Sequence, residues 1–314
     1  IENKKTYENF SLDLVKKRKE LENFVEKINN IPKKCLNVKN MMNLGTIMKY
    51  FYTIYDDLDL ENILNYSFGF NGYMDNMKGL YKNLSNEKIH LAKFKEKKNI
   101  LKFKKLYHPS IENPVKNDVN FKKNKIITGP NAAGKTTILK STILNTIFCQ
   151  QFGMGYFDSA TISPFNHIHC YINIPDTSGR DSLFQAEARR GKEILDIIEK
   201  NPNSRHFCVF DELYSGTNPY EAISSAASYL KYITKRKNVK FMLTTHFIRL
   251  CNIYKNDKKI ENFSMKTDII NDNSKYYYKI QKGISKIKGG ITVLKEIDYP
   301  KEILKNAKNI LEGL

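Results

Sequence analysis

The 314-residue chain has no tryptophan, only five cysteines and few acidic residues for its many basic ones. The cysteines are scattered and none forms a Cys-x-x-Cys pair, which argues against a disulfide framework and a zinc site and is typical of a reducing, intracellular compartment. No stretch is apolar for long enough to span a membrane, and no signal peptide is recognisable. The chain begins at Ile1 rather than Met, so nothing about preceding domains follows from its start.

Basic residues outnumber acidic ones by 52 to 33, which gives a net charge of +19. Such a balance favours anionic partners, above all nucleic acid. Lysine, asparagine and isoleucine are abundant along the whole chain, so part of the charge reflects a general bias of composition. The length suffices for one large or two modest domains.

The most informative motif is a phosphate-binding loop that follows a short apolar strand and precedes a helical pattern. Its glycines let the backbone N–H groups point at phosphate oxygens, and the helix N-terminus adds partial positive charge. We expect Lys135 to reach the β- and γ-phosphates of a nucleotide and Thr136 to bind Mg²⁺. The residues expected to hold the nucleotide are Gly129, Pro130, Asn131, Ala132, Ala133, Gly134, Lys135, Thr136 and Thr137.

Two later apolar runs end in polar groups that suit nucleotide hydrolysis. The run from His206 ends in Asp211 and Glu212, expected to bind Mg²⁺ and to orient the attacking water, respectively. The run from Val239 ends in His246, expected to contact the γ-phosphate. Taken alone, acids at a strand end are as often simply solvated as they are catalytic, and a lone histidine is usually structural. Their order after the phosphate-binding loop favours the catalytic interpretation.

Along the chain, the patterns predict an α/β P-loop NTPase preceded by an α-helical region. Residues 1–95 have helical spacing of apolar positions, including a stripe that starts at 41–43, with a turn-rich break at 68–72. Residues 96–120 are predicted to be a basic linker together with the entry to the ATPase domain, and 121–314 to be the P-loop ATPase domain. The lysines of the linker either touch DNA phosphates or are simply solvated.

Residues 106 to 311 resemble the ATPase domain of the MutS DNA mismatch-repair family, an ABC-like domain. The shared blocks occur in the family's order. They are Leu106–Pro109, Val115–Val119, Ile126–Asn131, Gly155–Ala160, Asp211–Thr217, Thr244–Phe247 and Glu261–Met265. The resemblance implies ATP and Mg²⁺ as cofactors and a homodimer with two composite sites, each completed by Ser182 of the other copy. It also implies a dimeric DNA clamp driven by ATP hydrolysis, in mismatch repair or a related transaction. Residues 1–95 then correspond by position to the helical lever.

Some positions depart from the family's pattern. The usual Met-Gly-Gly-Lys-Ser of the loop reads Ala-Ala-Gly-Lys-Thr here, which still meets the demands on the backbone. The family places an aromatic that stacks on adenine shortly before its Asn-Asp segment, where this chain has Pro114 and Val115. The partner-facing segment keeps Ser182, Phe184 and Glu187 in register. No mismatch-reading or clamp domain is recognisable.

Two alternatives stay open at this point. An ABC or SMC-type ATPase would carry Leu-Ser-Gly-Gly-Gln before the acidic strand and would have a long heptad coiled coil. This chain has Gly-Arg-Asp-Ser at residues 179–182 instead, and no such coiled coil is recognisable. A nucleotide-gated DNA-binding scaffold with little turnover would not need both Asp211 and Glu212.

Overall fold

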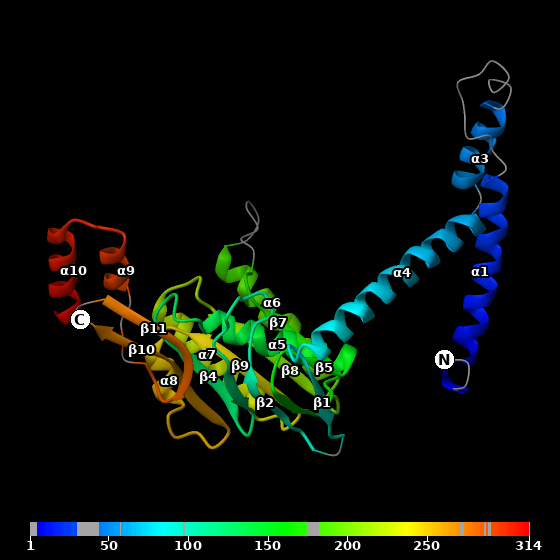
Figure 1. Ribbon diagram of the computed structural model, residues 1–314. Helices are drawn as coiled ribbons and strands as arrows, with labels where there is room; N and C mark the ends of the chain where they lie inside the picture. Colours follow the sequence, from blue (N-terminus) through cyan, green and yellow to red (C-terminus); the bar gives the residue numbers. More distant parts are fainter. Residues whose placement is uncertain are drawn as a thin grey trace. The chain divides into compact units, whose positions relative to one another are not determined.

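In the computed structural model the chain divides into two units, Ile1–Ser85 and Asn86–Leu314 (Figure 1). The structure describes residues 5–29, 44–56, 58–96, 98–174, 182–270, 273–285, 287 and 290–313. Two parts of the sequence prediction, the start of the helical stripe at 41–43 and the segment 179–181, lie outside these described residues. The division falls after Ser85, before the predicted boundary at residue 95.

The first unit is helical in its described residues, and its last helix corrects the sequence prediction. The stretch 68–72, predicted to be a break, lies inside α4. Gly69 and Gly72 each disfavour a helix by about 1 kcal/mol. Between them, however, Phe70 packs on Phe10 of α1, with the ring centroids 6.4 Å apart, and such packing overrides local propensity. The helices are η1 Lys5–Tyr7, α1 Glu8–Asn29, α3 Leu44–Asp56 and α4 Leu58–Ser85.

The second unit is built on two β-sheets. The larger has the strand order β11-β10-β4-β9-β8-β7, in which β11 is antiparallel and the others are parallel. Its strands are β4 Asn124–Thr128, β7 His167–Tyr171, β8 His206–Asp211, β9 Val239–Thr245, β10 Ile260–Ile270 and β11 Asn273–Lys282. The smaller has the order β3-β2-β6-β1-β5. Its strands are β1 His90–Phe94, β2 Leu101–Leu106, β3 Asn117–Asn120, β5 Met154–Gly155 and β6 Ser159–Ile162.

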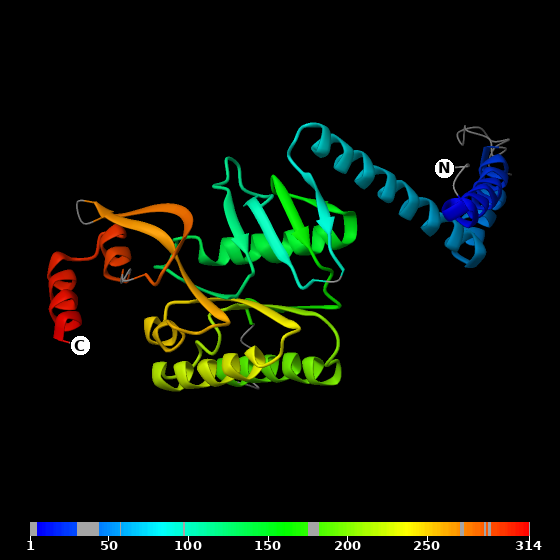
Figure 2. The same cartoon turned by 90° about the horizontal axis from the view of Figure 1, so that it is seen from below.

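Helices cover both faces of the larger sheet. Helix α5 lies between the two sheets, and α6, α7 and α8 cover the opposite face (Figure 2). The two remaining helices follow β11 at the C-terminal end of the described chain. None of the helices that the structure describes is long and apolar enough to cross a membrane. The helices are α5 Lys135–Phe152, α6 Leu183–Lys200, α7 Pro219–Thr234, α8 Ile248–Ile253, α9 Gly290–Glu296 and α10 Lys301–Gly313.

Strand β8 shows why the sequence folds this way. Phe207 and Val209 point into the core shared with α5, whereas Cys208 and Phe210 point into the core shared with α6 and α7. A strand covered on both faces needs such a continuous apolar run. Parallel strands end at the same edge of a sheet, so the polar residues that follow β4, β8 and β9 are brought together there.

The linker part of the prediction for 96–120 is wrong, because residues 101–106 form strand β2 of the smaller sheet. The later part, predicted as the entry to the ATPase domain, carries β3 of the same sheet. Leu101, Phe103 and Leu106 of β2 are buried, whereas Lys102 and Lys104 point away from the core. Residues 101–104 thus have the period-two pattern of a strand with one solvated face. The alternation shifts at Lys105, where φ is 51° and the pairing of β2 with β3 is irregular. The lysines make the segment look like a charged linker when only its composition is considered.

Candidate functional site

The phosphate-binding loop connects β4 to α5 and depends on glycine at both ends. A Cβ added to Gly129 would lie 3.2 Å from the Met265 Cβ atom, and one added to Gly134 would lie 3.2 Å from Tyr278 Cδ1. Gly134, at the N-cap of α5, has a φ of 91°, a conformation that glycine adopts without strain. Ala132 also has a positive φ, 62°. The loop therefore wraps tightly and starts α5 at Lys135.

Lys135 is folded across this loop and is nearly buried. Its Nζ atom donates to the carbonyl oxygens of Gly129 at 3.0 Å and Pro130 at 3.2 Å, and lies 3.8 Å from Glu212 Oε1. Burial lowers the pKa of the Lys135 ammonium below its ordinary value, although nearby carboxylates act in the opposite direction. An anion held by the loop would relieve this burial penalty, because it would pair with the ammonium more strongly than neutral carbonyls do.

Asp211 accepts hydrogen bonds from two threonines. Thr136 Oγ1, at the start of α5, lies 2.9 and 3.1 Å from the two carboxylate oxygens. Thr244, which pairs with Asp211 in the β8–β9 register, also donates its hydroxyl to the carboxylate. Hydroxyl and carboxylate oxygens are the hard donors that Mg²⁺ takes in proteins. Thr136 and Asp211 therefore fit the predicted metal ligands.

Glu212 follows β8 in a left-handed conformation, with a φ of 53°, and its N–H donates to the Thr244 carbonyl at 3.0 Å. Its Oε1 atom lies 3.4 Å from Nδ1 of His246. The hydrogen bond from His246 lowers the pKa of the Glu212 carboxyl, and the charges of His246 and Lys135 add to the effect against partial burial. The carboxylate is thus ionised at neutral pH and able to accept a proton or orient a water molecule.

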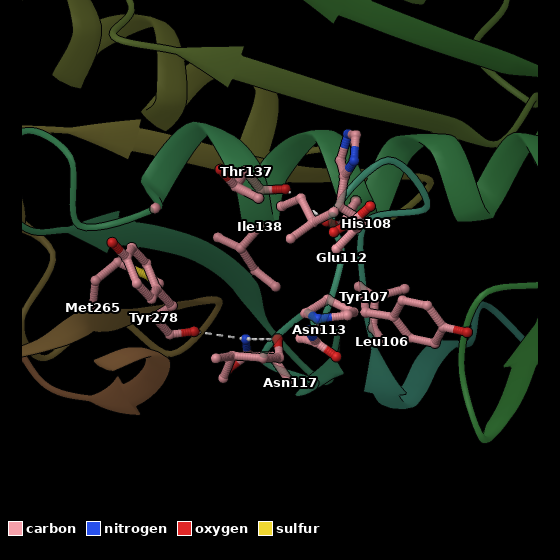
Figure 3. A pocket seen from close by; sticks show the side chains of 15 residues that line it. Leu106, Tyr107, His108, Glu112, Asn113, Asn117, Thr137, Ile138, Met265 and Tyr278 are labelled. Atoms are coloured by element: carbon pink, nitrogen blue, oxygen red, sulfur yellow. Dashed lines mark hydrogen bonds between the residues drawn. The ribbon is translucent and has the colours of Figure 1, made fainter. Parts of the chain in front are cut away.

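Two cavities flank the loop. One, of about 320 Å³, opens beside the start of α5 and is lined by residues that include His108, Val115, Ile138 and Tyr278 (Figure 3). The other, of about 360 Å³, contains the loop's first residues together with Glu212, His246 and Ser285. The loop thus separates a mostly apolar cavity from one that holds the candidate catalytic pair.

Tyr278 is a residue of this site that the sequence prediction missed. Asn117 of β3 donates to the Tyr278 carbonyl at 2.9 Å and accepts from the Ile280 N–H at 2.8 Å, which fixes β11 beside the cavity (Figure 3). The Tyr278 ring lies at the cavity wall next to Gly134. The sequence did contain a signal for this residue, the tyrosine run at 276–278. Alternate residues of a strand share a face, so such a run in a strand places aromatic rings on both faces, including the face that lines the cavity.

Ser182 is the one predicted site residue that the structure does not bring to the loop of its own chain. It caps α6: its Oγ accepts from the Gln185 N–H at 3.3 Å, and its N–H donates to Gln185 Oε1 at 2.8 Å. Its side chain is exposed. The Ser182 hydroxyl therefore lies at an exposed helix N-terminus, and a helix N-terminus favours anions.

Comparison with known proteins identifies the second unit. The family model for MutS domain V matches residues 125–314, which is more than half of the chain. The match includes the whole phosphate-binding motif, the two acids Asp211 and Glu212, and His246. The candidate binding and catalytic residues thus fall in one continuous match.

Curated relatives give a consistent result. A DNA mismatch repair protein MutS of Bacteroides thetaiotaomicron is 30% identical over 248 residues, covering 74% of this chain and 28% of that protein. One of Parabacteroides distasonis is 33% identical over 215 residues, covering 67% and 24%. An Endonuclease MutS2 of Streptococcus uberis is 29% identical over 246 residues, covering 77% and 31%. The chain spans less than a third of the length of these relatives.

Proposed function

This chain belongs to the MutS family, and we propose that it binds and hydrolyses ATP and uses the change of nucleotide state to act on DNA, in mismatch repair or a related transaction. The observation that carries the proposal is the convergence of three groups at the ends of β4, β8 and β9. They are the Lys135 ammonium, the Thr136–Asp211 pair and the Glu212–His246 pair. The experiment that tests it is steady-state ATP hydrolysis with and without DNA.

The chain's own groups would divide the work between binding and chemistry. Backbone N–H groups of the loop and Lys135 hold the phosphates. Thr136 and Asp211 would hold Mg²⁺, which neutralises charge on the phosphate oxygens when bound. Glu212, whose pKa the hydrogen bond from His246 lowers, orients the attacking water and accepts its proton. His246 also faces the cavity that would receive the γ-phosphate.

The base is proposed to lie in the apolar cavity against Tyr278. Substituting Tyr278→Ala should weaken ATP binding about fivefold or more, because base–aromatic stacking is worth about 1–3 kcal/mol. Tripolyphosphate, which has no base, should bind equally well to both proteins. Equilibrium binding of ATP and tripolyphosphate by calorimetry measures the difference.

Tyr277→Ala is the matched control, because Tyr277 lies near Lys266 and Lys275 rather than at the cavity. Tyr278→Phe should keep wild-type affinity, since the ring alone stacks. Equal loss of ATP and tripolyphosphate binding by Tyr278→Ala would remove Tyr278 from base recognition and leave it a support of the loop.

Each site is proposed to be completed by Ser182 of a second copy in a homodimer. The motivation is that Ser182 is exposed at the N-terminus of α6 and that its hydrogen bonds among the described residues are with Gln185, not with the phosphate-binding loop. A hydroxyl and a helix N-terminus together suit a γ-phosphate. The rival assignment to a transporter or chromosome-maintenance ATPase would need Leu-Ser-Gly-Gly-Gln before the acidic strand, which this chain does not have. The presence of both Asp211 and Glu212 favours turnover over a scaffold without hydrolysis.

DNA is proposed to contact the outer face of the smaller sheet. Lys93 of β1 pairs with Thr161 of β6, which pairs with Lys102 of β2, and Lys104 lies two residues further along β2. All three lysines are exposed, and no ion pair of theirs occurs among the described residues. Adjacent like charges repel and are relieved by a polyanion, so a phosphate backbone suits this face.

The triple variant Lys93→Gln, Lys102→Gln and Lys104→Gln should bind duplex DNA more weakly and less salt-dependently. The slope of log K against log salt should fall by about one for each phosphate that is no longer neutralised. A control with the same change in charge replaces Lys17, Lys78 and Lys192, which pair with Glu20, Asp75 and Asp196. Binding titrations over a series of salt concentrations decide between them. Equal effects of both triples would mean that DNA responds to net charge and not to this face.

A further inference from the structure

Glu187, in the second turn of α6, is a carboxylate that is only 3% exposed. Its Oε1 accepts from the Ser215 N–H at 3.2 Å and from the Ser215 hydroxyl at 3.1 Å, and its Oε2 accepts from the Gly216 N–H at 3.0 Å. Burying a carboxylate requires donors at both oxygens. Here the donors come from the loop that directly follows Glu212, so the burial of Glu187 joins α6 to that loop.

The same loop touches α6 at two further points. A Cβ on Gly216 would lie 2.7 Å from Leu183 Cγ and 3.0 Å from the Phe184 nitrogen, so the loop backbone packs directly on the first turn of α6. A Cβ on Gly191 would lie 2.6 Å from the Tyr214 hydroxyl oxygen, in the third turn. Contacts near residues 183, 187 and 191 lie on one face of a helix. The loop is thus held along three turns.

The loop's backbone conformation depends on these contacts. Glu212 and Tyr214 both have a positive φ, 53° and 61°, which residues with a side chain adopt only when their surroundings enforce it. Tyr214 also donates its N–H to the Tyr171 hydroxyl at 3.4 Å. A displacement of α6 is therefore expected to change the conformation at Glu212 rather than to be absorbed by a flexible connection.

We propose that Glu187 is a positioning residue that couples the two ATP sites of the dimer. Ser182 is the N-cap of α6 and, under the function proposed above, faces the nucleotide of the partner copy. Glu212 serves the nucleotide of its own chain. Because α6 and the Glu212 loop are joined through Glu187, engagement of Ser182 at one site sets the position of Glu212 at the other. Occupancy of one site then controls hydrolysis at its neighbour.

The test is the Glu187→Gln variant of the whole chain. An amide keeps the shape of the side chain, but it places an NH₂ group where one of the two oxygens was, so that either the Ser215 N–H or the Gly216 N–H faces another donor. Wild-type hydrolysis should rise cooperatively with ATP, with a Hill coefficient above about 1. In the variant the coefficient should fall to about 1 and kcat should drop about tenfold, while the ATP dissociation constant changes less than about twofold.

Two further variants keep the test decisive. Glu193→Gln makes the same chemical change on α6 at a carboxylate that pairs with Arg190 on the exposed surface, and should behave as the wild type. Ser215→Ala removes one donor to Glu187 and should show an intermediate loss of cooperativity even if Glu187→Gln fails to fold. Unchanged cooperativity in Ser215→Ala and in folded Glu187→Gln, beside an active wild type, overturns the coupling role. A wild type that does not hydrolyse ATP overturns the proposed function itself.

Discussion

Replacing Glu212 by Gln is expected to lower ATP hydrolysis by about 10²–10³-fold, the usual effect of removing one polar catalytic group. The loss arises because an amide cannot accept the proton of the attacking water. ATP binding should stay within a few-fold of wild type, since Lys135 and the loop hold the phosphates independently of this carboxylate. Single-turnover hydrolysis and equilibrium ATP binding on the same preparation separate the two effects.

Glu199→Gln provides the control for this substitution. Glu199 is a partly exposed carboxylate at the end of α6, near Arg236 and Tyr232, and has no part in the proposed ATP site. Its replacement should leave turnover unchanged. If Glu212→Gln hydrolyses ATP at near the wild-type rate, Glu212 is not the residue that activates water, and His246 becomes the group to test.

The second large effect concerns assembly. Ser182→Ala and Lys135→Ala should each be almost inactive alone, yet a mixture of the two should regain activity above both parents. The upper limit is about a quarter of wild-type activity, the value for independent sites, and the coupling through Glu187 proposed above lowers it. Random exchange makes half of the dimers mixed, and each mixed dimer contains one site with both an intact Lys135 and an intact Ser182. Phosphate release after co-refolding or long incubation of the two proteins measures the recovery.

The Ser182→Ala substitution removes both the cap of α6 and the hydroxyl proposed to face the partner's site, so the two effects must be separated. Gln185→Ala breaks the same capping box while it leaves Ser182 in place, and removing a cap costs about 1 kcal/mol of stability. This variant should keep most of its activity. A mixture that stays inactive, although mixed dimers are detected by native mass spectrometry, contradicts the assignment of Ser182 to the partner's site.

The candidate site could be located from the sequence because its groups follow short apolar strands. Asp211, Glu212 and His246 end runs whose residues are buried on both faces, and parallel strands bring such ends to one edge. The phosphate-binding loop has the strand–turn–helix context expected of its motif. For these residues the local sequence pattern therefore predicts the position in the folded structure.

Other features depend on contacts between distant segments, which no local pattern records. Tyr278 reaches the cavity only because Asn117, far away in sequence, fixes β11. The helix through Gly69 and Gly72 is supported by packing of Phe70 on another helix. The linker part of 96–120 was misassigned for a different reason, since the lysines of β2 hid the alternation of buried and exposed positions at 101–104.

The proposed ATP site is built on Lys135, Asp211 and Glu212: binding depends on Lys135 and on the Mg²⁺ that Asp211 would hold, and hydrolysis depends on Glu212 as well. Phosphate release from ATP by the purified chain tests this when it is measured with Mg²⁺, with a chelator in its place, and with the Lys135→Ala variant. We expect steady release that requires Mg²⁺ and that falls to background in the variant. Release that persists at the same rate with the chelator or in Lys135→Ala, or its absence from the wild type while ATP fails to bind, would contradict this site.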